Sequence, residues 1–168
     1  MTAGVRLQRA GKKCLIVSGG LSLHNVSPAE FLSLGGTFMP GDTAVEGEWD
    51  GNVLKSIRTR NLGKTPLEAA NFILCTGKFF SKGLVSSMDG VYEPLFGCDV
   101  DYLKDRVAWV NRDFFEPQPF ESFGVVTTPD GCVMRGGIPA ANLYAAGEIL
   151  SGKVDIVKSS LEVCRKLI

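Results

Sequence analysis

The sequence predicts an α/β fold in which helices alternate with parallel strands. Two short apolar runs, 71–75 and 143–146, each end close to a glycine, which is typical of buried parallel strands that break into a turn. A third apolar run at 14–17 follows a helical pattern. A strong β-hairpin signal precedes the run at 71–75. We therefore expect a partial Rossmann-like domain, with a parallel sheet and a β-hairpin layer.

Composition supports one soluble domain of 168 residues. Lys plus Arg and Asp plus Glu both total 18, and this balance argues against a nucleic-acid groove or an anionic membrane surface as partner. No apolar run approaches the ~20 residues that a membrane span requires, so we expect no direct membrane insertion. Five cysteines without a CxxC pair and a single histidine make a structural zinc site unexpected. A reduced, cytoplasmic domain without a metal is the prediction.

Residues 1–34 are interpreted as the remnant of an amino-terminal βαβ unit. The pattern of 2–10 predicts a helix, and the glycine and two lysines that follow suit the negative end of its dipole. The run 14–17 then predicts a buried strand. A complete nucleotide-binding unit would begin with a strand and a GxGxxG turn that holds a pyrophosphate, and we expect both to be lacking here. Ser18 stands where the second strand of such a unit usually carries an acidic residue.

His24 lies just beyond this strand. A lone histidine is more often a loop or core residue than a catalyst, but imidazole titrates near neutrality, so His24 is a candidate acid–base group. The catalytic residue is otherwise left open. Ser27-Pro28-Ala29-Glu30 fits a capping box with proline at the first helical position, which predicts a short helix that runs to Leu34.

Residues 35–141 are predicted to form a β-rich central part. A short strand is expected at 37–39, and the arms 44–49 and 53–60 flank Asp50-Gly51-Asn52, a strong hairpin signal. A second buried strand is expected at 71–75, and it leads directly into Thr76 and Gly77.

The second half of the central part carries weaker signals. Residues 101–111 fit either a helical turn or an irregular loop. The two prolines within 114–120 predict an extended segment that is not helical. Residues 124–128 and 132–134 predict a second hairpin across a Pro-Asp-Gly turn.

Residues 142–168 are expected to hold the last strand and a helix. The strand 143–146 stops at Gly147, which allows a sharp turn and the close approach of another molecule. Glu148 lies just beyond the carboxyl end of that strand, where open α/β sheets bind their ligands, and its carboxylate can accept hydrogen bonds from a sugar hydroxyl. The alternative is an ordinary surface loop after a buried strand. A helix is expected at 161–168, and the whole of 1–168 is expected to be one domain.

Two of these motifs resemble those of flavoproteins of the two-dinucleotide-binding-domain type. Phe72-Ile73-Leu74-Cys75-Thr76-Gly77 is similar to their Ala-Thr-Gly motif, and the stretch from Asn142 to Glu148 is similar to their later strand motif. In that later motif an acidic residue binds the ribityl chain of the flavin. The resemblance implies FAD or FMN as cofactor, with candidate contacts at Ser18, Gly19, Thr76, Gly77, Gly147 and Glu148.

A narrower resemblance covers most of residues 1–152. The segments 35–42, 76–85, 93–100 and 113–120 are similar to the B subunit of anaerobic glycerol-3-phosphate dehydrogenases. Members of that family are considerably longer, with an additional region ahead of Gly35. They also continue into a glycine-rich turn after the last strand, which this chain lacks.

The resemblance implies oxidation of glycerol 3-phosphate to dihydroxyacetone phosphate. Electrons would pass to a quinone through partner subunits, a catalytic flavoprotein and a membrane-anchoring iron–sulfur subunit, which would hold a cytoplasmic protein at the inner membrane. One alternative is a non-catalytic remnant that binds a partner subunit, with an incomplete flavin site. A second is a flavin reductase of the fumarate-reductase type, against which the segment 114–120 argues.

Overall fold

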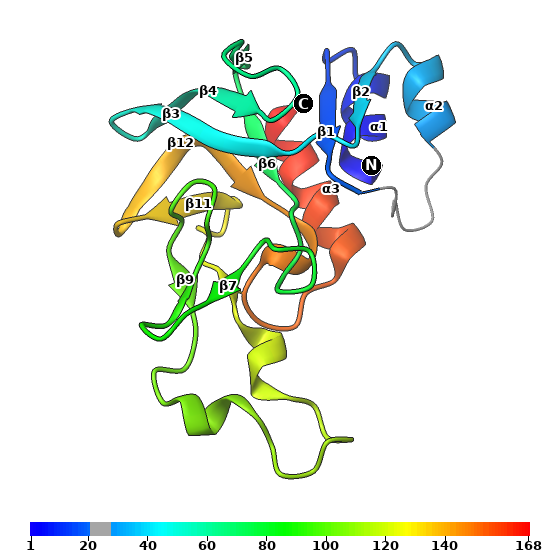
Figure 1. Cartoon of the computed structure of the whole chain (residues 1–168). Coiled ribbons are helices and arrows are strands. Elements are labelled where there is room, and N and C mark those ends of the chain that lie inside the picture. Colours follow the sequence, from blue (N-terminus) through cyan, green and yellow to red (C-terminus); the bar gives the residue numbers. More distant parts are fainter. Residues whose placement is uncertain (21–27) are drawn as a thin grey trace.

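The computed structural model describes residues 1–20 and 28–168. In Figure 1 a β-rich part lies beside a smaller part made of two helices and two strands, and α3 (Ile156–Leu167) contacts both parts. The smaller part consists of α1 (Thr2–Arg9), β1 (Leu15–Ser18), α2 (Pro28–Ser33) and β2 (Thr37–Pro40). His24 and the start of the capping box lie outside the described residues.

β1 and β2 form a parallel pair in which Leu15 lies opposite Thr37. The position of this strand was predicted correctly, but its burial was not. Leu15 is 44% exposed, and the rest of β1 is half-buried. The reason is that β1 and β2 form a two-stranded sheet of their own, apart from the other strands. The expected single parallel sheet is therefore divided into two parallel pairs.

The predicted hairpin is confirmed as β3 (Ala44–Asp50) and β4 (Val53–Thr59), with Gly51 and Asn52 in the turn. Gly51 has φ +60°, a conformation that glycine adopts without strain. β4 also pairs with the short β5 (Leu67–Glu68), which completes a three-stranded antiparallel sheet.

The second parallel pair belongs to a sheet with the order β11–β12–β6, made of β11 (Cys132–Arg135), β12 (Ile138–Ala145) and β6 (Phe72–Leu74). β12 and β6 run parallel, with Ala145 opposite Leu74. Since parallel neighbours end at the same edge of a sheet, the segments that follow these two strands leave side by side. The remaining short elements are β7 (Val85–Ser86), β8 (Val91–Tyr92), β9 (Val100–Asp101), β10 (Gly124–Val125) and the 3₁₀ helices η1 (Arg106–Trp109), η2 (Pro119–Ser122) and η3 (Gly147–Ile149).

Asn142 joins the two three-stranded sheets through its side chain. Its Oδ1 accepts the Leu54 N–H at 2.8 Å, and its Nδ2 donates to the Leu54 carbonyl at 2.8 Å and to the Ala70 carbonyl at 3.1 Å. Because Leu54 is fully buried, these bonds satisfy backbone groups that water cannot reach. Asn142 thus fixes β12 against β4 just before the strand reaches the site described below.

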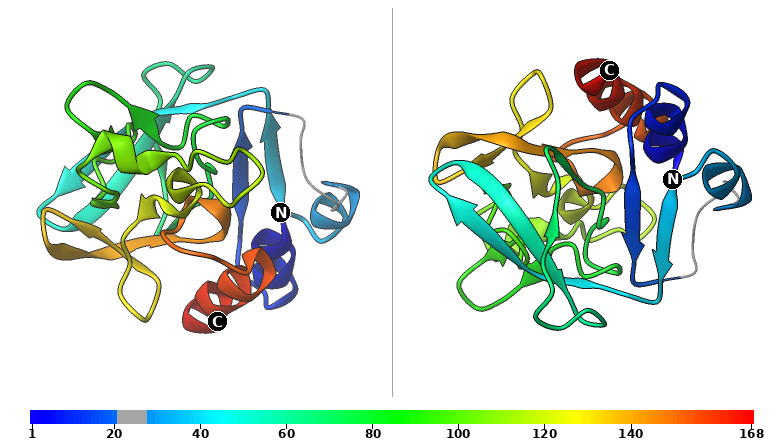
Figure 2. Two further views of the ribbon diagram at one scale, coloured as in Figure 1. Left: turned by 90° about the horizontal axis from the view of Figure 1, so that it is seen from below. Right: turned by 90° about the horizontal axis from the view of Figure 1, so that it is seen from above.

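The core is built mainly from the β-rich part. Leu54, Val133, Leu143 and Ile149 are fully buried, and Phe123 is 2% exposed. α3 covers the β11–β12–β6 sheet with its buried face, where Val163 packs with Tyr144 and Ala146. Two views in Figure 2 show α1 and α3 side by side, and a small apolar cluster of Ala3, Leu7 and Cys164 lies between them.

Several boundaries differ from the sequence-based expectation. The helix after the last strand begins at Ile156 instead of 161, because the Asp155 side chain accepts the Lys158 N–H and caps it earlier. The last strand begins at Ile138, so it crosses the expected boundary at 142. The segment 114–120 is not wholly extended, because Pro119 begins η2 with its fixed φ at the first position of the 3₁₀ helix.

The second predicted hairpin is only partly formed. Gly124 and Val125 pair with β9 rather than with β11, although Thr127 and Val133 form an isolated bridge. β11 takes β12 as its antiparallel partner, with Arg135 opposite Ile138. Residues 101–111 contain both of the alternatives that the sequence allowed, an irregular loop and the single 3₁₀ turn of η1.

Candidate functional site

The carboxyl ends of β6 and β12 lie next to each other. The Ala146 N–H donates to the Leu74 carbonyl at 3.0 Å, which extends the parallel pairing to the last residue before the turn. Gly77 and Gly147 follow, with φ of +70° and +83°. Residues with a Cβ rarely adopt this left-handed conformation, so both turns depend on glycine.

Glu148 lies over the turn that follows β6. Its Oε2 is 3.8 Å from the position that a Cβ on Gly77 would occupy. The Ser81 Oγ lies 2.7 Å from the same position, so any side chain at 77 would collide with it. A carboxylate oxygen, a hydroxyl and two glycine backbones therefore gather at this edge of the sheet.

The turn after β6 folds back tightly on itself. The Gly83 N–H donates to the Lys78 carbonyl at 3.0 Å, and Lys82 adopts φ +61°, which is uncommon for a residue other than glycine. A Cβ on Gly83 would lie 1.9 Å from the Gly77 carbonyl oxygen and 2.7 Å from the Thr76 Oγ1. The Thr76 hydroxyl is buried in this contact and has no hydrogen-bond partner among the described residues. Strained backbone and unpaired buried hydroxyls of this kind concentrate at functional sites.

α3 holds the turn after β12 from the other side. The Gly147 N–H donates to the Ser159 Oγ at 3.1 Å, and Ser159 is itself largely buried in the first turns of α3. The Ile156 Cγ2 lies 3.8 Å from the position of a Cβ on Gly147. The amino end of α3 therefore packs directly against the turn that presents Glu148.

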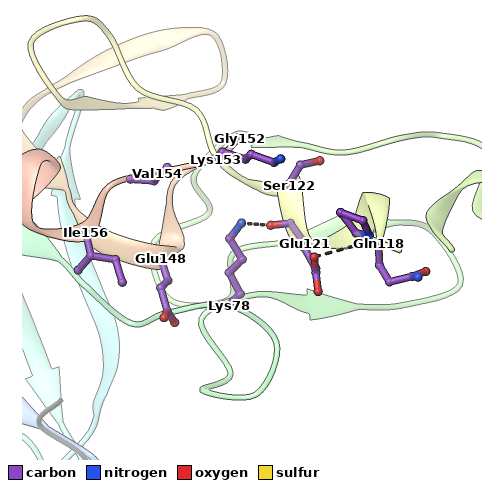
Figure 3. A pocket seen from close by; sticks show the side chains of 10 residues that line it. Lys78, Gln118, Glu121, Ser122, Glu148, Gly152, Lys153, Val154 and Ile156 are labelled. Atoms are coloured by element: carbon purple, nitrogen blue, oxygen red, sulfur yellow. Dashed lines mark hydrogen bonds between the residues drawn. The ribbon is translucent and has the colours of Figure 1, made fainter. Parts of the chain in front are cut away.

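A cavity of about 410 Å³ opens beside these turns (Figure 3), which is within the usual range of small-molecule sites. Glu148 and Lys78 line it from the strand ends, Lys153 from the segment that leads into α3, and Ile156 from the first residue of α3. The opposite wall is formed by η2 and the residues before it. The lining residues on that wall are Pro117, Gln118, Glu121 and Ser122.

Lys78 spans the cavity from one wall to the other. Figure 3 shows its Nζ directed at Glu121, and it donates to the backbone carbonyl of that residue. Removal from water lowers the pKa of Lys78, while the negative charges of Glu148 and Glu121 act in the opposite direction. The side chain thus ties the turn after β6 to η2, and it places a cation close to Glu148.

The six predicted contact residues do not all share this site. Gly77, Gly147 and Glu148 come together, with Thr76 buried beneath the turn, and of the six only Glu148 lines the cavity. Ser18 and Gly19 follow β1 and do not line the cavity, and the Thr43 Oγ1 is 2.7 Å from the position of a Cβ on Gly19. His24 lies outside the described residues, so the structure does not test it.

Sequence reasoning missed two residues of this site, Lys78 and Ser159. Lys78 immediately follows Gly77, and a lysine next to a glycine turn at a strand end could have been predicted from the sequence as a residue of the site. Ser159 gave none, because its contact with Gly147 depends on where α3 begins and on how it packs.

Comparison with known sequences identifies the fold family. Residues 20–160 match the family of FAD binding domains. The B subunit of anaerobic glycerol-3-phosphate dehydrogenase from Yersinia enterocolitica is 41% identical over 133 residues, which cover 79% of this chain and 31% of the relative. The Aliivibrio fischeri (strain MJ11) protein of the same name is 39% identical over 153 residues, or 84% of this chain and 34% of the relative.

The chain thus spans about a third of the length of the curated relatives that it matches. The expected similarity to these B subunits is confirmed. No helix in the described ranges, 1–20 and 28–168, is both long and apolar enough to cross a bilayer. Both the match over residues 20–160 and the small parallel sheet lead to one conclusion: this chain belongs to the FAD-binding domain family.

Proposed function

We propose that this chain is a flavin-dependent oxidoreductase subunit that binds FAD at the carboxyl ends of β6 and β12. The observation that supports this most strongly is the parallel pairing of the two strands, after which Gly77 and Glu148 lie side by side. Ligands of open α/β sheets bind at this edge. The family match supports FAD rather than FMN.

The residues at these strand ends fit such a cofactor. The Glu148 carboxylate can accept hydrogen bonds from the hydroxyls of a ribityl chain, and Gly147, whose Cβ position has its nearest atom at 3.8 Å, leaves room for a ligand to approach the backbone. The Thr76 hydroxyl, unpaired within the described residues, can gain a partner if the turn shifts. At the end of β1, Ser18 and Gly19 would contact another part of the same dinucleotide.

The proposed reaction is the oxidation of glycerol 3-phosphate to dihydroxyacetone phosphate. The flavin would supply the redox chemistry by accepting a hydride equivalent, and the protein would position and tune it. Lys78 and Lys153 line the cavity together with Glu121 and Glu148, and the two ammonium groups would pair with the phosphate of such a substrate. Relatives named as the B subunit of a dehydrogenase support a multisubunit assembly, through which electrons would pass to a quinone at the inner membrane.

The test is spectroscopic. The purified chain, mixed with FAD and separated from excess cofactor, should absorb at about 450 nm, where oxidised flavins absorb. Glycerol 3-phosphate added without oxygen should bleach this band, and succinate should not. A preparation that stays colourless would contradict flavin binding and favour a non-catalytic role. A bound flavin that succinate reduces would contradict the substrate.

A further inference from the structure

The two lysines that line the cavity differ in how firmly they are held. Lys78 is half-buried, and its Nζ donates to the Glu121 carbonyl of η2. Lys153 is exposed, and its side chain has no hydrogen bond or ion pair with the residues that the structure describes. A lysine that moves freely in water loses rotational freedom when a ligand immobilises it. Lys78 has already lost much of that freedom, so binding costs it less entropy.

The carbonyl group that holds Lys78 is itself fixed by two further contacts of η2. The Phe120 ring packs edge to face on Phe79, with the ring centres 6.2 Å apart. The Gly152 N–H donates to the Ser122 carbonyl at 2.7 Å. η2 is thus tied both to the turn after β6 and to the segment that leads into α3. The Lys78 ammonium group therefore has a defined position between the two walls of the cavity.

The ammonium group of Lys78 keeps two donors for a ligand. It carries three N–H bonds, and within the described residues only the bond to the Glu121 carbonyl has a partner. None of the ion pairs in that part of the chain includes Lys78. Figure 3 shows the Glu148 carboxylate directed away from the Lys78 Nζ. An acceptor inside the cavity can therefore take the two remaining N–H bonds.

The sum of the lining charges does not select an anion, so the position of each charge must do so. The two lysines are balanced by Glu121 and Glu148, and the four formal charges cancel. An anionic ligand is attracted only where a cation is nearer to it than a carboxylate. The Glu121 Oε2 accepts the Gln118 N–H at 3.3 Å, which turns this carboxylate back to the start of η2. The carbonyl of Glu121, and not its carboxylate, therefore meets Lys78.

Partial burial makes an unpaired charge on Lys78 unfavourable. Removal from water lowers the pKa of Lys78, and the negative charges of Glu148 and Glu121 offset this effect only in part. A phosphate group that accepted the two remaining N–H bonds would stabilise the charged form, because hydrogen bonds between charged groups are the stronger ones.

We propose that Lys78 is the specificity-determining residue of the cavity and makes it selective for a phosphorylated small polyol over the unphosphorylated one. This inference rests on the proposed function, in which glycerol 3-phosphate is the substrate. The phosphate would accept the two remaining N–H bonds of Lys78 while the lysine stays bound to η2. Lys153 would add only the weak attraction of an exposed charge. The two lysines therefore make unequal contributions to binding.

Titration calorimetry with glycerol 3-phosphate and with glycerol tests the proposal, because the two ligands differ only in the phosphate group. Both are titrated into the chain without cofactor and into the chain with FAD that has been reduced beforehand, so that no turnover consumes the ligand. Lys78→Met should weaken glycerol 3-phosphate binding about tenfold or more and leave glycerol binding unchanged. Lys78→Arg, which keeps the charge, should retain most of the preference. Lys153→Met should weaken glycerol 3-phosphate binding by less than about threefold.

The salt dependence of binding separates recognition of the phosphate from a purely structural role of Lys78. In the wild type the affinity for glycerol 3-phosphate should fall as salt is added, and this dependence should shrink in Lys78→Met. Loss of a merely structural contact would weaken both ligands and leave the salt dependence as it was. The matched control is Lys64→Met, which removes the charge of an exposed lysine outside the cavity lining. It should leave both affinities unchanged.

Several results would overturn the inference. A wild-type chain that binds glycerol 3-phosphate no better than glycerol would do so, as would an undiminished preference in Lys78→Met. An equal loss of both ligands in that variant, or an equally large loss in Lys153→Met or Lys64→Met, would also overturn it. If FAD binds but Lys78→Met keeps the preference, only this inference fails. If FAD does not bind but the preference depends on Lys78, only the proposed flavin function fails.

Discussion

The Glu148 Oε2 lies 3.8 Å from the position of a Cβ on Gly77, although the two residues are 71 positions apart in the sequence. This closeness results from the parallel register of β6 and β12, in which Leu74 lies opposite Ala145. The turns at Gly77 and Gly147, where both glycines have a left-handed conformation, therefore lie next to the same carboxylate, that of Glu148. A ligand held at this edge by Glu148 would therefore lie close to both turns.

Substitution Glu148→Gln is expected to weaken FAD binding about 10- to 100-fold, because hydrogen bonds to a charged acceptor are the stronger ones. Titration of FAD, followed by quenching of its fluorescence, measures the effect. The matched control is Glu162→Gln, at an exposed position on α3, which should leave the affinity unchanged. Equal FAD affinities of the wild type and Glu148→Gln would show that Glu148 does not contact the cofactor.

Substitution Gly83→Ala should destabilise the protein by about 3 kcal/mol, because the new Cβ would lie 1.9 Å from the Gly77 carbonyl oxygen. The control Gly11→Ala tests backbone strain without a clash, since Gly11 has φ +78° and no neighbour within 4 Å. It should cost about 1 kcal/mol. Urea unfolding compares the two variants. A Gly83→Ala variant as stable as Gly11→Ala would show that the turn after β6 is not packed as described.

Substitution Asn142→Ala removes the side chain that joins β12 to β4 and leaves the buried Leu54 N–H and carbonyl unpaired. We expect a loss of about 2–3 kcal/mol in the free energy of unfolding. Asn52→Ala serves as control, because Asn52 is exposed and its side chain makes one hydrogen bond, to the Pro139 carbonyl at 3.2 Å. It should cost about 0.5 kcal/mol. Similar losses in both variants would argue against a bridging role for Asn142.

Asp42 should make stability depend on pH in the acid range. Burial by itself would raise the pKa of this carboxyl group, but the Thr59 hydroxyl, the N–H groups of Asn61 and Thr43 and the charge of Arg60 together hold its pKa below the ordinary 3.8. A lowered pKa means that the ionised form stabilises the native state above pH 3.8. This contribution is lost as the pH falls through the lower native value.

The variant Asp42→Asn isolates this contribution. Its stability should fall less than that of the wild type as the pH is lowered below 4, because the amide does not titrate there. Thermal unfolding between pH 2 and 5 gives the comparison. Parallel pH profiles for the two proteins would mean that Asp42 has the same pKa in the folded and unfolded chains.

Local signals predicted the parts of the fold that local chemistry decides. Asp50-Gly51-Asn52 specified the β3–β4 turn, because the conformation at Gly51 favours glycine. The glycines at 77 and 147 likewise marked where β6 and β12 end. The parts that depend on distant partners were not predicted. β10 pairs with the distant β9 instead of β11, and β1 pairs with β2 apart from the other strands.

The same distinction holds for the site. The pair Gly77 and Glu148 followed from the expectation that neighbouring parallel strands end at one edge. The position of the Lys78 side chain depends on its hydrogen bond to the Glu121 carbonyl in η2, and the sequence did not predict where η2 lies. Ser18 and Gly19 were placed at the same ligand by resemblance, and they lie at the end of the separate β1–β2 pair.

The most direct test of the cofactor site is hydrogen–deuterium exchange of the chain with and without FAD. Binding at the strand ends predicts that added FAD slows exchange in two separate segments, 75–84 and 146–159, and leaves the β3–β4 hairpin unchanged. Exchange that is unaltered in both segments, or slowed only elsewhere, would contradict a flavin site built on Gly77 and Glu148.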